Sequence, residues 1–112
     1  MQLARLGDAG SERPFVRVGE DAFVDVSDVV GDFDEAFFGA GGPAQLTNVV
    51  AERASAGRTQ PREGRRFGAP IARPHQILCI GLNYSDHAAE TGQPVPEEPI
   101  LFTKSPNTLV GP

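Results

Sequence analysis

The chain has 112 residues, of which 39% are hydrophobic and 22% are charged, and this composition excludes a collagen, a coiled coil and a wholly disordered chain. Its 13 glycines and 10 prolines predict many turns and long loops. No apolar run approaches the roughly 18 residues that a membrane span needs, and no signal sequence opens the chain. The single cysteine excludes an internal disulfide and a thiolate metal site. We therefore expect a cytoplasmic protein that does not contact a membrane.

The charge is segregated along the chain. Residues 1–52 carry a net charge of −7, residues 53–73 carry six arginines and a net charge of +5, and the remainder carries −3. An arginine-rich stretch can bind nucleic acid, because each phosphate that it neutralises releases counterions. This stretch holds one aromatic residue and is interrupted by Gly and Pro, so we favour a solvated linker that pairs with the acidic N-terminal part. No nucleic-acid partner is expected.

Residues 1–57 predict a small α+β unit. Apolar runs at residues 2–6, 14–18 and 22–26, separated by glycine turns, predict an antiparallel meander. In the third run, Phe23 alternates with Val24, which predicts one buried and one wet face. Helices are expected over residues 32–38 and from Pro43 to Gly57, because Pro suits a first turn and Gly ends a helix.

The second half of the chain begins with a predicted linker over residues 58–74, which Pro and Gly interrupt repeatedly. The apolar run at residues 76–80 is typical of a strand buried on both faces, and it makes Cys79 a small core residue rather than a nucleophile. A short helix over residues 84–90 and a short strand over residues 100–103 are expected to follow. His75 is expected in an exposed loop.

His87 and Glu90 are the residues that suggest chemistry. Their spacing in the predicted helix puts both on one face, close enough to hydrogen-bond. A carboxylate that holds one imidazole nitrogen raises the basicity of the other, as a water-activating base requires. The alternative is an ordinary solvated ion pair on a helix surface.

The surroundings of this pair resemble a known family. The residues from Gly81 to Gly92 read GLNYSDHAAETG, directly after the apolar strand, and PILFTK and a final Gly-Pro follow. This succession resembles the opening of the catalytic domain in the fumarylacetoacetate hydrolase family, over residues 75–112. Residues 1–57 are similar in general pattern to the small N-terminal domain of many bacterial members. The resemblance implies a β-rich α+β fold, with the small domain at 1–57, a linker at 58–74 and the start of a mixed β-roll at 75–112.

The resemblance also implies roles for individual residues. In the family, Mg²⁺ or Mn²⁺ chelates the substrate oxygens and acts as a Lewis acid, while a His and a Glu deprotonate water or substrate. Those positions are His87 and Glu90 here, and the family lysine corresponds to Lys104. Asn83 and Tyr84 would shape the substrate pocket. Alternatively, Lys104 is a solvated strand end, Asn83 caps the helix and Tyr84 packs beneath it.

The carboxylates that hold the metal in this family have no counterpart in the sequence. Two of them form a Glu-x-Glu pattern, which occurs nowhere in the chain, and the adjacent Glu97-Glu98 pair is no substitute. The resemblance assigns no metal role to Asp86. We therefore expect the N-terminal part of a longer enzyme, truncated here and inactive by itself.

These features predict a metal-dependent hydrolase or lyase that cleaves C–C bonds in small oxo acids such as acylpyruvates, or decarboxylates or isomerises them. The full-length enzyme is expected to be a homodimer. Ureidoglycolate lyase and hydroxy-dienedioate isomerase, an enzyme of aromatic catabolism, are alternatives within the class. The alternative from another class is a non-catalytic binding or interaction module, in which His87 and Glu90 form only an ion pair.

Overall fold

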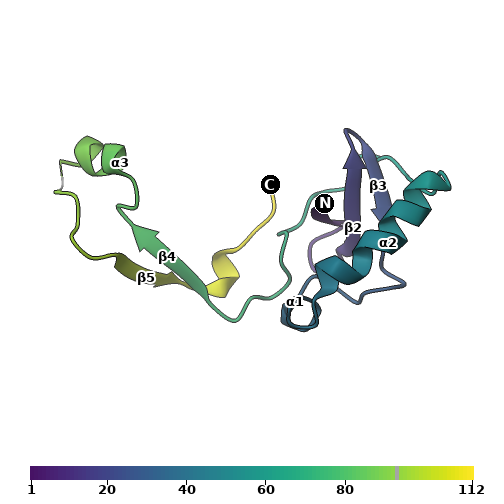
Figure 1. Ribbon diagram of the computed structural model, residues 1–112, viewed down its shortest axis with the longest axis horizontal. Helices are drawn as coiled ribbons and strands as arrows, with labels where there is room; N and C mark the ends of the chain where they lie inside the picture. The colour runs from purple at the N-terminus through teal and green to yellow at the C-terminus, as the bar shows by residue number, and fades with distance from the viewer. Residues whose placement is uncertain (93) are drawn as a thin grey trace. The chain divides into compact units, whose positions relative to one another are not determined.

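A computed structural model describes residues 1–92 and 94–112 of the chain, with the exception of the His87 side chain. The chain divides into two compact units. The first contains Met1–Pro74 together with Leu109–Pro112, and the second contains His75–Thr108. Both units mix strands and short helices, and their strands form two separate antiparallel sheets (Figure 1). The predicted α+β class is therefore confirmed.

The first unit is built on a three-stranded meander. Its strands are β1 (Gln2–Leu6), β2 (Arg13–Gly19) and β3 (Ala22–Asp25), and they pair antiparallel in the order β1-β2-β3. Leu3 lies opposite Val16, which in turn lies opposite a valine of β3. The meander predicted from the three apolar runs is confirmed.

Two helices follow the meander, α1 (Glu35–Gly39) and α2 (Gly42–Ser55). The carboxylate of Asp34 accepts a hydrogen bond from the Phe37 amide at 3.1 Å, which caps the first turn of α1. This helix begins later than predicted, because Asp32 forms an ion pair with Arg5 instead of starting the helix.

Helix α2 agrees closely with the sequence prediction. Gly41 precedes it with a left-handed φ of 72°, and Pro43 lies in its first turn. Gly57, with a φ of 70°, follows its last residue by two positions. Figure 1 shows α2 lying along the sheet. One face of the sheet and the two helices bury a common apolar cluster, consisting of Val16, Val24, Val26, Phe33, Phe37, Leu46 and Val50.

The opposite face of the sheet is also covered, which corrects the prediction of a wet face. Phe23 is 1% exposed, as is Phe15, and both belong to a second apolar cluster with Ala4 and Leu6. Phe67 packs against this cluster, with its ring centroid 6.0 Å from that of Phe23. The alternation in β3 did not reveal this, because the covering residue lies far along the chain.

Residues 58–74, which we call the arginine strap, therefore pack on the sheet instead of forming a solvated linker. The Gln60 amide donates to the Phe23 carbonyl, and the Phe23 amide donates to the Gln60 carbonyl, both at 2.9 Å. The Gly68 amide donates to the Arg5 carbonyl at 2.7 Å. The guanidinium of Arg65 stacks 4.9 Å from the Phe15 ring. Arginines of the strap also pair with N-terminal acids, as predicted.

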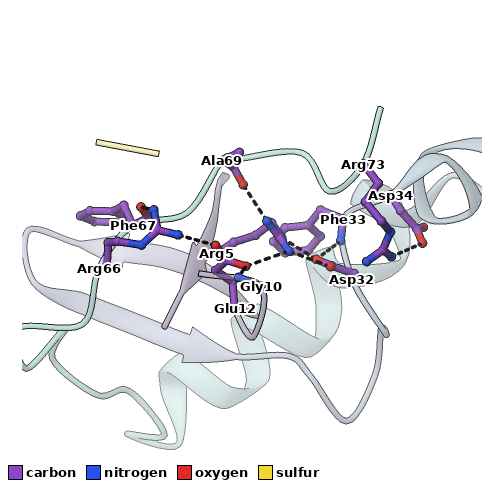
Figure 2. A network of polar contacts seen from close by, with 10 residues as sticks. All are labelled: Arg5, Gly10, Glu12, Asp32, Phe33, Asp34, Arg66, Phe67, Ala69 and Arg73. Carbon is purple, nitrogen blue, oxygen red and sulfur yellow. Dashed lines mark hydrogen bonds and ion pairs between the residues drawn. The ribbon is translucent and has the colours of Figure 1, made fainter. Parts of the chain in front are cut away.

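A buried network of charges joins the strap to β1, as Figure 2 shows. Arg5 is 8% exposed and donates to both carboxylate oxygens of Asp32, from Nε at 2.7 Å and from Nη2 at 2.9 Å. Its Nη1 also donates to the Ala69 carbonyl at 3.2 Å. The buried carboxylate of Glu12 pairs with Arg66 and lies 3.5 Å from Arg5. We call these four charged side chains the clasp.

The second unit contains a two-stranded sheet. Strands β4 (Ile77–Gly81) and β5 (Ile100–Lys104) pair antiparallel, and a short 3₁₀ helix, η1 (Pro106–Thr108), follows. The prediction that the first strand is buried on both faces is wrong for the described residues, since Leu78 is 61% and Ile80 47% exposed. Its one hydrogen-bonded partner among the described strands is β5, and that pairing covers neither face. None of the described helices is long and apolar enough to cross a membrane.

Candidate functional site

The candidate site begins where β4 ends. Helix α3 (Ser85–Glu90) starts four residues after Gly81, and the Ala88 amide donates to the Tyr84 carbonyl at 3.2 Å. The helix ends at Glu90, and Gly92, two positions later, has a left-handed φ of 65°. The predicted strand–helix succession around the GLNYSDHAAETG motif is thus present (Figure 1).

His87 and Glu90 both lie in α3, three positions apart. Helix geometry puts residues at this spacing on the same side of the helix. Glu90 is exposed, while the side chain of His87 lies outside the described part of the structure. The backbone therefore provides the spacing that the predicted pair needs, and the catalytic role of the pair stays a prediction.

A hollow of about 240 Å³ lies beside the turn between β4 and α3. Its walls come from that turn, including Leu82 and Asn83, and from residues 95–99 of the proline-rich segment. Asn83 is thus at a cavity, as a substrate-binding residue would be. Tyr84 is 70% exposed, which rules out the alternative that it packs beneath the helix.

Lys104 lies at the other end of the two-stranded sheet from this turn. In the register of the sheet it faces Ile77, whereas Gly81, next to the turn, faces Ile100. Four residues of extended strand separate these pairs by about 13 Å. The structure therefore does not bring Lys104 to the hollow, and its exposure agrees with the alternative of a solvated strand end.

A centre for a hard metal ion needs several oxygen ligands close together. Among the described residues, no three His, Cys, Asp or Glu side chains gather closely enough to hold a metal ion. Glu97 and Glu98 both line the hollow, but two adjacent carboxylates do not supply the six or more oxygens that a hard cation prefers. The described side chains therefore do not fit a metal ion.

The first unit contains a second polar hollow, of about 400 Å³, at the end of α2. Its walls include Arg53, whose two terminal nitrogens each donate to Asp28 at 2.8 Å. These hydrogen bonds lower the pKa of Asp28 and raise the pKa of Arg53. Arg13 and Asp25 form a further ion pair there at 2.9 Å. The charges are largely paired with one another, which favours a structural role.

Sequence reasoning missed Leu82. Its φ is 48°, in the left-handed region, at the turn that leads into α3. Sequence patterns usually indicate such a conformation through Gly or Asn, and a leucine carries no such signal.

Comparison with known proteins covers the segment in which this candidate site lies. The family described as Fumarylacetoacetate (FAA) hydrolase C-terminal matches residues 76–112, which include β4, α3 and β5. Residues 76–112 thus match the fumarylacetoacetate hydrolase family, and the resemblance stated from the motif is confirmed.

Particular relatives fall into two groups. Human FAHD2A, a mitochondrial oxaloacetate tautomerase, is 44% identical over 70 residues, which cover 61% of this chain and 22% of the relative. A Burkholderia ambifaria protein, named as a hydrolase without a stated substrate, is 36% identical over 120 aligned positions. That alignment covers all of this chain and 38% of the relative. The chain therefore spans between about a fifth and two fifths of the length of these relatives.

Proposed function

We propose that this chain supplies the proton-transfer part of the active site of a fumarylacetoacetate hydrolase-type enzyme. The substrates would be small 2-oxo acids such as acylpyruvates, and the reaction would be hydrolysis or lysis of a C–C bond. One observation carries the proposal. Helix α3, with His87 and Glu90 at one-turn spacing, lies within the matched segment, and the turn that joins it to β4 lines a hollow.

The two residues would divide the work of a general base. The imidazole of His87 accepts a proton from a water molecule, and the resulting hydroxide attacks the distal carbonyl of the substrate. The C–C bond between this carbonyl carbon and its neighbour on the side of the 2-oxo group would then break, so that a carboxylic acid forms and the enolate of the 2-oxo acid leaves. The imidazolium would return its proton to that enolate. The carboxylate of Glu90 stabilises the imidazolium that forms. Asn83, at the wall of the hollow, would hold a substrate oxygen through its side-chain amide.

Tautomerisation is the second candidate reaction, favoured by the relatives named as oxaloacetate tautomerases. In that reaction the same base takes a proton from the carbon beside the 2-oxo group. The proton is then delivered to the oxygen of the resulting enolate, which gives the enol, so that no bond between carbons breaks. The two candidates require the same residues and differ in the group from which the proton is taken.

Several properties of the whole enzyme are part of the proposal. Members of the family generally use a divalent metal, and we propose Mg²⁺ or Mn²⁺ held by carboxylates outside the described residues. When bound, the cation would stabilise negative charge on substrate oxygens. We also propose a homodimer with a mixed β-roll, located in the cytoplasm, without a nucleic-acid partner.

A chimera tests the proposed function. In the chimera, residues 1–112 of this chain would replace the segment of the Burkholderia ambifaria relative with which they align, which is 38% of that relative. With Mg²⁺ and acetylpyruvate we expect turnover by the chimera and none by the unaltered chain. Chromatography of the products detects C–C cleavage, and exchange of the carbon-bound protons with deuterium detects tautomerisation.

The two histidines of the chain provide a matched pair of variants in the chimera. His87→Ala should lower kcat by about 10²–10⁴-fold, since it removes the general base. His75→Ala, outside α3, should leave kcat unchanged. Full turnover by His87→Ala would contradict the proposed role, and robust turnover by the unaltered chain would contradict the proposal that it supplies only part of the site.

A further inference from the structure

The turn before α3 contains an unfavourable backbone conformation. Three non-glycine residues of the described chain have a positive φ, namely Glu63 at 56°, Arg73 at 44° and Leu82 at 48°. In this region the Cβ of an L-residue approaches the carbonyl oxygen that follows, and a bulky side chain gains no local hydrogen bond in return. Glu63 and Arg73 lie in the arginine strap, whereas Leu82 lies between β4 and α3.

Leu82 lies in a short connection between two elements. Gly81 is still paired with Ile100 in the two-stranded sheet, yet α3 begins at Ser85. Only three residues connect the two elements, so the backbone of these residues determines how α3 is joined to β4. Leu82 and Asn83 both line the hollow beside this turn.

We propose that Leu82 is a positioning residue of the proposed active site. Its left-handed backbone sets the angle between β4 and α3, so that Asn83 lies at the hollow and the helix carrying His87 and Glu90 is held beside it. This inference rests on the proposed function. Leucine keeps this unfavourable conformation only because the structure around the turn imposes it, whereas glycine would adopt other conformations there as readily.

Backbone relaxation of the unaltered chain tests the positioning itself, without any enzymatic activity. In the native sequence we expect nitrogen-15 order parameters near 0.85 for the Ala88 and Ala89 amides, typical of a rigid backbone. Leu82→Gly should lower them below about 0.6, since the turn becomes flexible. Leu82→Asn should keep values close to the native ones, because Asn tolerates the left-handed conformation and retains a side chain.

The other two left-handed residues supply matched controls. Glu63→Gly and Arg73→Gly make the same change at the same kind of backbone position, and they should leave the order parameters of α3 unchanged. The inference is overturned if α3 is already flexible in the native chain, or if Leu82→Gly leaves its order parameters as they were. It is also overturned if Leu82→Asn loosens α3 as much as Leu82→Gly does.

Kinetics of the chimera test the consequence for catalysis. Leu82→Gly should lower kcat at least tenfold with KM within twofold, because a displaced base affects the transition state more than binding. Leu82→Asn should restore most of kcat, and Glu63→Gly should not change it. If His87→Ala abolishes turnover and Leu82→Gly does not reduce it, the inference about Leu82 fails and the proposed function stands. If His87→Ala is fully active, the proposed function fails, whatever the relaxation data show for the turn.

Discussion

Arg53 and Asp28 show how a single pair of side chains connects the end of a helix to the sheet. Arg53 lies in the last turn of α2 and donates to the Asp25 carbonyl at 2.7 Å as well as to the carboxylate of Asp28. The hydrogen bond from Arg53 lowers the pKa of Asp28 from its usual 3.8 in the folded state. The ionised carboxylate is therefore bound more favourably in the folded chain than in the unfolded one.

This pair should make the stability of the first unit depend on pH. Because the folded pKa of Asp28 is the lower one, its contribution is complete above an unfolded pKa of 3.8 and is lost as the pH falls through the folded pKa. Asp28→Asn should therefore lower the melting temperature slightly at pH 7, with a difference that vanishes in acid. The effect is small because the Asp28 side chain is 68% exposed.

Thermal unfolding followed by circular dichroism from neutral to acidic pH measures this difference. Asp8→Asn, a change in an exposed loop, is the control and should show no comparable offset. If Asp28→Asn lowers the melting temperature by the same amount in acid as at neutral pH, the ion pair is not the cause of the difference.

At the scale of elements, the clasp makes the arginine strap a layer of the fold. A Cβ on Gly68 would lie 2.6 Å from Cγ of Glu12, so this glycine allows the strap to approach the buried carboxylate. The Glu12 side chain is 7% exposed and pairs with Arg66 of the strap. A buried charge costs free energy unless it is paired, so strap and carboxylate depend on each other.

Two substitutions should therefore be coupled. Gly68→Ala should lower the free energy of unfolding by about 2–3 kcal/mol, because Glu12 must move and its ion pair breaks. Glu12→Ala should cost about 2 kcal/mol by removing the same pair. The double variant should cost little more than Glu12→Ala alone, because the truncated side chain makes room for the new methyl group.

Urea denaturation of the three variants completes a double-mutant cycle. Gly31→Ala is the control, since a Cβ there would meet no atom within 4 Å. Additive losses for Glu12→Ala and Gly68→Ala would mean that the strap does not depend on the clasp.

At the scale of the whole molecule, the two units differ in how completely they bury apolar side chains. The first unit covers both faces of its sheet, with fully buried Phe15, Phe23 and Phe33. In the second, Leu78 and Leu101 are 61% and 63% exposed on a two-stranded sheet. Two strands without a covering layer are marginally stable in water.

Hydrogen exchange should separate the two units. Amides of β1, β2 and β3 should exchange only when the first unit unfolds, whereas those of β4 and β5 should exchange at least 100-fold faster in the unaltered chain, because local opening exposes little new apolar surface. Mass spectrometry of peptides from each sheet measures the difference. Equal protection of both sheets would contradict it. In the chimera, protection of β4 and β5 should rise.

The sequence alone was sufficient wherever structure is set by neighbouring residues. Short apolar runs separated by glycine turns determine the meander, and Pro43 and Gly57 mark the limits of α2. These signals are readable because they act through the local backbone geometry. The same holds for α3, whose ends follow from residues 84–92. The GLNYSDHAAETG motif likewise indicated the family whose model matches residues 76–112.

Only the tertiary structure decided which surfaces are buried. Phe23 is covered because Phe67, far away in the chain, packs on it, and Arg5 is buried because Asp32 and the strap supply its partners. The apolar β4 is exposed, although its composition is typical of a buried strand. Burial depends on contacts between distant segments, and a local pattern shows which side chains could be covered without showing what covers them.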